Sequence, residues 1–245
     1  MKDLFSVKDK VVLITGGSGG IGSALVKGFV EAGATVSNFD KHTPQSKAAE
    51  YYKVNLSNRD ELMEAWEKFI KKNKRIDVLI TCAAVTCPRT LVEYPLSAWE
   101  NTLAITLDAV FNICQQAGLQ MIEQGEGGSI INFTSINAAV AMPNNPSYAA
   151  AKAGVRQLTK SFALDWGKHR IRVNNLGPGY TATQMNMQSL NDPEARKFRA
   201  DKSMLGRWAQ PEEMVGPAIF LASDASSFIT GTDLWVDGGW LSKGM

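Results

Sequence analysis

The sequence predicts an α/β fold in which helices cover both faces of a doubly wound parallel sheet. Short apolar runs alternate with amphipathic stretches of helical period along all 245 residues. These runs are apolar at nearly every position, which is typical of strands buried on both faces. Parallel neighbours need crossover helices, and the fixed hand of the crossovers distributes those helices over both faces. No linker rich in proline, glycine and serine divides the chain, so we expect a single domain over residues 1–245.

The predicted elements follow one another as strand and helix with few exceptions. The first strand, Val11-Val12-Leu13-Ile14-Thr15, is rich in β-branched residues, and the glycines after it lead into a helix. Further strands are expected at 34–39, 51–54, 77–81, 129–134, 171–175 and 233–236, and helices at 21–32, 60–72, 98–124, 146–167 and 211–222. The weakly patterned residues 181–206 follow the sixth strand, where open α/β sheets carry loops over the ligand crevice. We therefore expect this segment to form a lid over the substrate.

Composition and charge exclude several classes of protein. The formal net charge is +2, and basic residues are dispersed among acidic ones, so no nucleic-acid-binding stripe is expected. No apolar stretch is long enough to span a membrane, and the charged N-terminus does not resemble a secretory signal. Cys82, Cys87 and Cys114 show no metal-ligand spacing, and only two histidines accompany them. We therefore expect free thiols, no metal and a cytoplasmic location.

A glycine-rich segment, Thr15-Gly16-Gly17-Ser18-Gly19-Gly20-Ile21-Gly22, joins the first strand to the first helix. Glycine lets the backbone approach a phosphate, and the N–H groups and dipole of a helix N-terminus favour its negative charge. The segment lacks the Gly-Lys-Ser/Thr ending of a nucleotide triphosphatase loop, which favours a dinucleotide over ATP. A glycine-rich turn with only a structural role remains an alternative.

Asp40 stands at the end of the second predicted strand, eighteen residues after Gly22. A carboxylate there can accept both hydroxyls of an adenosine ribose, and it repels a 2′-phosphate. This placement favours NAD(H) over NADP(H). Lys41 keeps the phosphorylated cofactor open as an alternative, because a basic residue here could reach its phosphate.

Tyr148 and Lys152 lie four residues apart on a predicted helix, and Ser135 lies thirteen residues before Tyr148. Residues at this spacing share one helix face. An unperturbed phenol has a pKa of about 10, so a neighbouring ammonium is needed to favour the phenolate near neutral pH. A serine hydroxyl can hold the oxygen whose proton the tyrosine gives or takes. The three side chains thus suggest acid–base chemistry between an alcohol and a carbonyl, although this spacing also occurs by chance on alanine-rich helices.

Five ordered motifs together resemble the classical short-chain dehydrogenase/reductase family over essentially the whole chain. They are the glycine loop at 15–22, Ser135, the pair Tyr148 and Lys152, Pro178-Gly179 with Thr183, and the ending 231–239. The resemblance implies a seven-stranded Rossmann sheet, a nicotinamide cofactor and a homotetramer. Within the family, the runs 177–183, 206–208 and 236–240 are similar to sugar-acid and polyol oxidoreductases.

The resemblance also implies roles for individual residues. Tyr148 would act as the acid or base, Lys152 would lower its pKa and bind the nicotinamide ribose, and Ser135 would orient the substrate oxygen. The cofactor-binding residues would be Gly16, Ser18, Gly20, Ile21, Asp40, Asn55, Leu56, Ala83, Tyr148, Lys152, Pro178, Thr181 and Thr183. Ser135, Asn137 and Tyr180 would contact the substrate.

Three positions depart from the family pattern. Ala84 replaces a glycine after the fourth strand, and Asn55 replaces an acidic residue after the third. Thr106 stands where the family carries an asparagine that completes a proton relay through lysine and water. A threonine can rebuild such a relay with water, slow it, or bond its own preceding helical turn. Thr106 and Ala84 leave a cofactor-binding scaffold without turnover as one alternative to an NAD-dependent dehydrogenase. Within the enzyme class, an NADPH-dependent 3-oxoacyl-type reductase is the other alternative.

Overall fold

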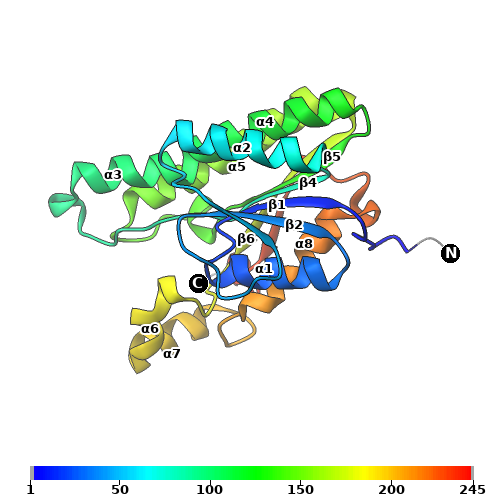
Figure 1. The fold of residues 1–245 in the computed structure, drawn as a ribbon. Helices are drawn as coiled ribbons and strands as arrows, with labels where there is room; N and C mark the ends of the chain where they lie inside the picture. Colours follow the sequence, from blue (N-terminus) through cyan, green and yellow to red (C-terminus); the bar gives the residue numbers. More distant parts are fainter. Residues whose placement is uncertain (1–2, 244–245) are drawn as a thin grey trace.

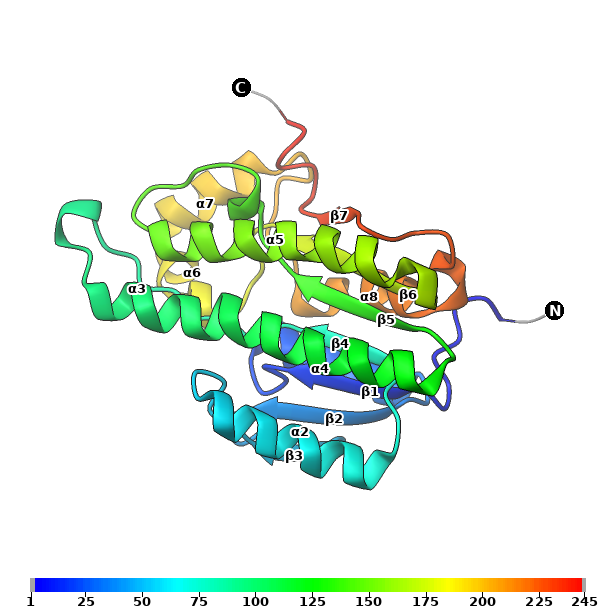
Figure 2. The same ribbon diagram turned by 90° about the horizontal axis from the view of Figure 1, so that it is seen from above.

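A parallel sheet of seven strands forms the centre of the protein, in the order β3-β2-β1-β4-β5-β6-β7. The computed structural model describes residues 3–243. Helices α2, α4 and α5 cover one face of the sheet, and α1 and α8 cover the other (Figures 1 and 2). The predicted doubly wound α/β fold with a seven-stranded Rossmann-like sheet is therefore confirmed.

Each observed strand overlaps a predicted one. The strands are β1 (Val11–Thr15), β2 (Thr35–Asp40), β3 (Glu50–Lys53), β4 (Val78–Thr81), β5 (Gly128–Phe133), β6 (Ile171–Pro178) and β7 (Asp233–Val236). The largest difference is at β6, which was expected to end at residue 175. It continues to Pro178 because Gly177 and Pro178 pair with Trp235 and Val236 of β7. The extension brings the Pro178-Gly179 segment to the edge of the sheet where the site lies.

The helices also follow the predicted order, with one interruption. They are α1 (Gly20–Glu31), α2 (Arg59–Asn73), α3 (Leu96–Leu103), α4 (Ala109–Gln124), α5 (Pro146–Trp166), α6 (Met187–Asn191), α7 (Pro193–Lys202) and α8 (Val215–Ala222). Short 3-10 turns lie at Leu91–Glu93, Ile136–Ala138, Gly167–His169, Gln184–Asn186, Pro211–Met214 and Asp224–Ser226. The stretch 98–124 was expected to be one regular helix, but a π turn at Ala104–Asp108 separates α3 from α4. Such turns are rare and often occur at functional sites.

The segment 181–206, predicted as a weakly patterned lid, contains α6 and α7. Asp192 starts α7 by accepting hydrogen bonds from the N–H groups of Glu194 and Ala195, and Pro193 occupies the first turn. This is a standard helix start. The sequence reasoning did not assign these helices, because their mixed polar and methionine residues give no clear apolar face.

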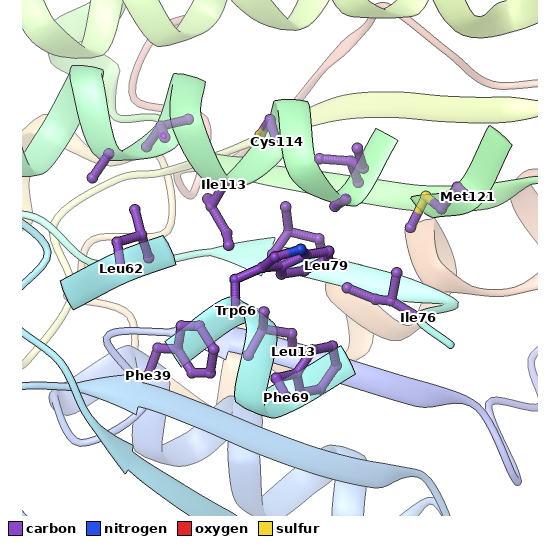
Figure 3. Packing of buried hydrophobic residues seen from close by; sticks show 14 of the residues in the cluster. Leu13, Phe39, Leu62, Trp66, Phe69, Ile76, Leu79, Ile113, Cys114 and Met121 are labelled. Atoms are coloured by element: carbon purple, nitrogen blue, oxygen red, sulfur yellow. The ribbon is translucent and has the colours of Figure 1, made fainter. Parts of the chain in front are cut away.

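Two apolar layers, one on each face of the sheet, make the core. The layer under α2 and α4 contains Phe39, Trp66 and Phe69, and the rings of Phe39 and Phe69 meet edge to face with centroids 6.1 Å apart (Figure 3). The opposite layer packs α1 and α8 against the alternate residues of β1, such as Ile14. Burial of each large apolar side chain contributes about 1.5–3 kcal/mol. None of the described helices is both long and apolar enough to cross a bilayer.

Candidate active site

The predicted site residues gather at the carboxyl ends of the strands. The glycine loop follows β1, Asp40 ends β2, Ser135 follows β5 and Pro178 ends β6. All strands of the sheet are parallel, so these ends lie along one edge. Ligands of open α/β sheets bind at this edge.

The glycine loop is shaped by contacts that exclude side chains. Gly16 has a φ of +75°, and a Cβ on Gly22 would lie 2.0 Å from the carbonyl oxygen of Gly16. A Cβ on Gly17 would lie 2.5 Å from Oδ1 of Asn38. The first turn of α1 has neither a capping side chain nor an acidic residue. The loop therefore leaves a helix N-terminus open to an anion, and a dinucleotide pyrophosphate fits this arrangement.

Asp40 is buried, and its carboxylate is fixed by the loop it faces. Oδ2 accepts a hydrogen bond from the N–H of Ser18 at 3.0 Å, and Oδ1 accepts one from the N–H of His42 at 2.9 Å. Asn38, which the sequence reasoning missed, accepts from the N–H of Gly17 at 2.9 Å and donates to Oγ of Ser18 at 3.1 Å. An amide inside an otherwise apolar strand was the available signal for it.

The residues expected to bind the adenosine differ in which of their groups a ligand could contact. Asn55 is exposed, and its Oδ1 accepts a hydrogen bond from Oγ of Ser57 at 2.9 Å. The side chain of Leu56 packs against the core layer, which leaves only its backbone for a ligand. Ala83 packs against Gly16, and Ile21 in the first turn of α1 packs on the opposite core layer.

The residues after β6 close the other side of the crevice. Thr183 lies against the glycine loop, because a Cβ on Gly20 would come within 2.7 Å of its methyl carbon. The hydroxyl of Thr181 donates to the carbonyl oxygen of Gly179 at 3.2 Å, so that side chain holds its own turn. Pro178 pairs with Val236 in the sheet.

The predicted catalytic residues are brought together by α5 and the end of β5. Ser135 lies beside Tyr148, close enough for its hydroxyl to affect the pKa of the phenol. Nζ of Lys152 lies 5.7 Å from the centroid of the Tyr148 ring and donates to the carbonyl oxygen of Phe133 at 2.5 Å. Lys152 is buried and Tyr148 is half-buried. The helical spacing and the serine upstream thus predicted a real cluster.

Burial is the largest influence on the pKa values of Tyr148 and Lys152. It raises the pKa of Tyr148 to about 12, although the hydrogen bond from Ser135 lowers it in part. This is opposite to the lowering expected from Lys152. Burial also lowers the pKa of Lys152 to about 8. The chain alone therefore holds Tyr148 as a protonated acid at neutral pH, and further positive charge is needed before it can act as a base.

Cys82 lies beside the cluster. Burial raises the pKa of its thiol to about 12, although the ammonium of Lys152 acts in the opposite direction. The thiol is neutral near pH 7. Cys82, Cys87 and Cys114 are all unpaired.

The structure clarifies two of the three departures. The backbone of Ala84 is not left-handed, because left-handed backbone at described non-glycine residues occurs only at Asp9, Lys74, Asn144 and Arg170. Thr106 is fully buried in the π turn, and its Oγ1 accepts a hydrogen bond from the N–H of Val85 at 3.4 Å. By contrast, the hydroxyl of Thr102, one turn earlier, donates to the carbonyl oxygen of Ala98 in its own helix at 2.7 Å. Thr106 thus links the helix to the segment after β4.

Two further sets of contacts hold α5, and neither was predicted from the sequence. At its N-terminus, the hydroxyl of Tyr94 lies 2.5 Å from that of Ser147, and Thr86 donates to Oδ1 of Asn145 at 2.8 Å. Along its length, a buried polar row connects strands to helix. Its members are Thr81, Asn132, Thr159, Asn175, Asp233 and Arg156. Polar residues inside apolar strands were the available signal.

The expected substrate residues flank the cluster. The N–H of Asn137 donates to Oγ of Ser135 at 3.2 Å, which places it in the turn after β5. The hydroxyl of Tyr180 donates to the sulfur of Met142 at 3.5 Å, and its ring packs against Trp208. Tyr180 thus connects the segment before α5 with the lid.

The open helix N-terminus, Asp40 and the Ser135–Tyr148–Lys152 cluster together fit a nicotinamide dinucleotide. The glycine loop would hold its pyrophosphate, Asp40 its adenosine ribose and Lys152 its nicotinamide ribose. When bound, it supplies the acceptor or donor of a hydride. The described residues contain no group of three or more histidine, cysteine or acidic side chains that could hold a metal ion.

Comparison with known proteins gives matches over nearly the whole chain. Gluconate 5-dehydrogenase from Gluconobacter oxydans is 34% identical over 251 residues, covering 97% of this chain and 96% of that protein. The 3-oxoacyl-[acyl-carrier-protein] reductase from Thermotoga maritima is 36% identical over 245 residues, covering 95% and 98%. A crystal structure of gluconate 5-dehydrogenase from Burkholderia cenocepacia with NADP and tartrate has 33% identity, 99% coverage of both chains and a TM-score of 0.94.

The sequence model of the family described as enoyl-(acyl carrier protein) reductase matches residues 16–241. This range begins in the glycine loop and extends past the last strand. The relatives are dehydrogenases and reductases that match this chain over nearly their whole length. The chain therefore belongs to the short-chain dehydrogenase/reductase family.

Proposed function

We propose that this protein is an NAD(H)-dependent oxidoreductase that interconverts a secondary alcohol and a ketone on a sugar acid, with sugars and polyols as related substrates. The observation that carries the proposal is the cluster of Ser135, Tyr148 and the buried Lys152. The substrate class is supported by relatives named for gluconate and 2-dehydro-3-deoxy-D-gluconate. The related crystal structure also contains tartrate, a hydroxy acid.

The mechanism assigns one task to each residue. Ser135 holds the substrate oxygen, and Tyr148 gives a proton to it during ketone reduction or takes one during alcohol oxidation. Burial keeps Tyr148 protonated in the chain alone, which suits the acid role. The base role requires Lys152 to be charged and a cationic oxidised nicotinamide to be bound, since both favour the phenolate. Holding the reacting groups in place contributes to rate by removing orientational freedom.

Asp40 supports NAD(H) as the cofactor. It ends β2, it is buried, and two backbone N–H groups fix its carboxylate. A carboxylate at this position repels a 2′-phosphate. Three related crystal structures contain NADP, and comparing turnover with NAD⁺ and NADP⁺ tests the choice.

Turnover with matched variants tests the proposal. We expect purified protein to reduce NAD⁺ with D-gluconate, a related sugar acid or a polyol, as followed by absorbance of the reduced nicotinamide. Tyr148→Phe should abolish turnover while NADH binding persists, because only the hydroxyl is lost. Unchanged turnover in that variant would reject the role of Tyr148. Cofactor binding without turnover on any alcohol or ketone would favour the scaffold, and faster NADPH-dependent reduction of a 3-oxoacyl thioester would favour the acyl reductase.

We also propose that residues 1–245 act as a single NAD(P)-binding domain and assemble as a cytoplasmic homotetramer. Exposed apolar side chains on α4 and α5 support the assembly, with Leu119 57% and Leu164 84% exposed. Light scattering after size exclusion should give the mass of four chains, and a monomer would reject this part.

A further inference from the structure

A small cavity lies between the lid and the segment that follows β7. Its volume is about 190 Å³, and its lining includes Tyr180, Arg199 and Trp240 but not the catalytic Tyr148. Hydrogen bonds join its two walls, because the carbonyl oxygen of Gly238 accepts from the N–H of Met204 at 2.9 Å and from Oγ of Ser203 at 3.0 Å. The lid helices and the segment after β7 lie side by side in both views (Figures 1 and 2). The walls of the cavity are therefore held together by hydrogen bonds of the folded chain.

Arg199 is a cation in this cavity without an anionic partner. Its guanidinium lies 5.0 Å from the ring centroid of Tyr180 and 5.9 Å from that of Trp208. Among residues 3–243, no carboxylate lies within ion-pair distance of Arg199, and its guanidinium donates no hydrogen bond. An arginine stacked on aromatic rings keeps its N–H edge available for a planar acceptor.

The other charged groups of the cavity are already satisfied. Arg207 makes two hydrogen bonds of 2.7 Å with Glu213. Asp237 accepts hydrogen bonds of 2.9 Å from the N–H groups of Gly239 and Leu241. The indole N–H of Trp240, in contrast, is buried and has no partner within the described chain. The unsatisfied groups of the cavity are thus donors, and an unpaired buried donor is unfavourable until a ligand satisfies it.

We propose that Arg199 and Trp240 form a binding site for a carboxylate. The inference rests on the proposed function where it identifies this carboxylate as that of the sugar-acid substrate. Arginine binds carboxylates through two parallel hydrogen bonds, and the indole N–H adds a third donor. Tyr180 lies between the cavity and the segment before α5. Its ring stacks on the guanidinium of Arg199, and its hydroxyl donates a hydrogen bond to the sulfur of Met142 in that segment. The site would therefore select acids over neutral polyols.

Two substrates that differ only at the carboxylate test this selection. D-sorbitol carries a hydroxymethyl group where D-gluconate carries the carboxylate. We expect Arg199→Met to raise KM for D-gluconate by roughly 10- to 100-fold, the effect of losing a charge-assisted hydrogen bond. For D-sorbitol, kcat/KM should stay within about twofold. Trp240→Phe should raise KM for gluconate by several-fold and provides a second variant if Arg199→Met does not fold.

Arg196→Met is the matched control, because Arg196 lies on the same helix, is exposed and does not line this cavity. It should leave both substrates unchanged. Equal losses for gluconate and sorbitol in Arg199→Met would overturn the proposal, since they would indicate a general defect of the lid.

Calorimetric titration of D-gluconate into the Tyr148→Phe protein separates this proposal from the proposed function. Heat that disappears with Arg199→Met supports the carboxylate site even if no sugar acid is turned over, and then identifies a non-reacting carboxylate as its ligand. The same heat in both proteins, or none in either, overturns the site even where Tyr148-dependent turnover is found.

Discussion

The hydroxyl of Thr106 accepts a hydrogen bond from the backbone N–H of Val85, and the two atoms lie 3.4 Å apart. This contact joins the π turn between α3 and α4 to the segment that follows β4. Thr106 is fully buried, so no bulk solvent replaces the contact if it is lost. Thr106 therefore links the π turn to the segment that follows β4, close in sequence to Cys82.

Replacing Thr106 tests whether this link matters for turnover. Thr106→Val should lower kcat by up to about tenfold, because loss of one hydrogen bond is worth about 0.5–1.5 kcal/mol. Thr106→Asn should retain turnover, since its amide oxygen can still accept from Val85. Thr102→Val is the control, because that hydroxyl bonds only its own helix. Steady-state kinetics of the three variants measures the effect. A kcat of Thr106→Val equal to that of the wild type would show that the link does not matter for turnover.

The sequence predicted the elements whose pattern is regular. Buried strands such as β1 and the catalytic spacing of Tyr148 and Lys152 depend on local periodicity, which a single sequence carries. The π turn at Thr106 was not predictable from periodicity, because five residues do not disturb a helical pattern of this length. The pKa of Tyr148 was also expected in the wrong direction for the chain alone, since burial depends on the packing of distant segments.

Contacts between polar residues that lie far apart in the sequence were the other feature that was not predicted. Asn38 and Asn132 were visible as amides within apolar strands, but their partners Gly17, Ser18 and Thr159 are fixed only by the sheet. The unpaired state of Arg199 likewise depends on where α7 lies. The candidate site was therefore predicted at the residues that belong to local motifs, and missed where tertiary packing decides.

Asp40 should determine the preference between the two nicotinamide cofactors. We expect Asp40→Asn to increase the ratio of kcat/KM for NADP⁺ to that for NAD⁺ by at least about tenfold, or 1.4 kcal/mol, because the charge facing a 2′-phosphate is removed. The amide keeps one oxygen as an acceptor for Ser18 or His42, so the loop should stay folded. Lys41→Met tests the alternative that Lys41 binds the 2′-phosphate. A large fall in kcat/KM for NADP⁺ in that variant would assign phosphate binding to Lys41. A wild type that prefers NADP⁺ would reject the role of Asp40.

The hydroxyl of Tyr94 should position the catalytic helix. Tyr94→Phe removes the contact with Ser147, the residue before Tyr148. The variant should have a lower kcat, and its free energy of unfolding should fall by about 1 kcal/mol. Tyr51→Phe is the matched control. The Tyr51 hydroxyl is buried and has no hydrogen-bond partner within the described chain, so its removal should be neutral or stabilising. Equal thermal shifts and equal kcat in the two variants would mean that the short Tyr94–Ser147 contact contributes nothing.

The buried ammonium of Lys152 should make stability depend on pH in the absence of cofactor. Its pKa is about 8 in the folded protein and 10.5 in its ordinary state, so the unfolded chain binds a proton that the folded chain releases in this window. The contribution of Lys152 to stability therefore rises with pH, by about 1 kcal/mol between pH 7 and pH 9. Lys152→Met should lack this gain, while Cys82 and Cys114, whose raised pKa values act in the opposite direction at higher pH, remain in both proteins. Urea denaturation of both proteins across this range measures the difference, and parallel curves would show that Lys152 is not desolvated.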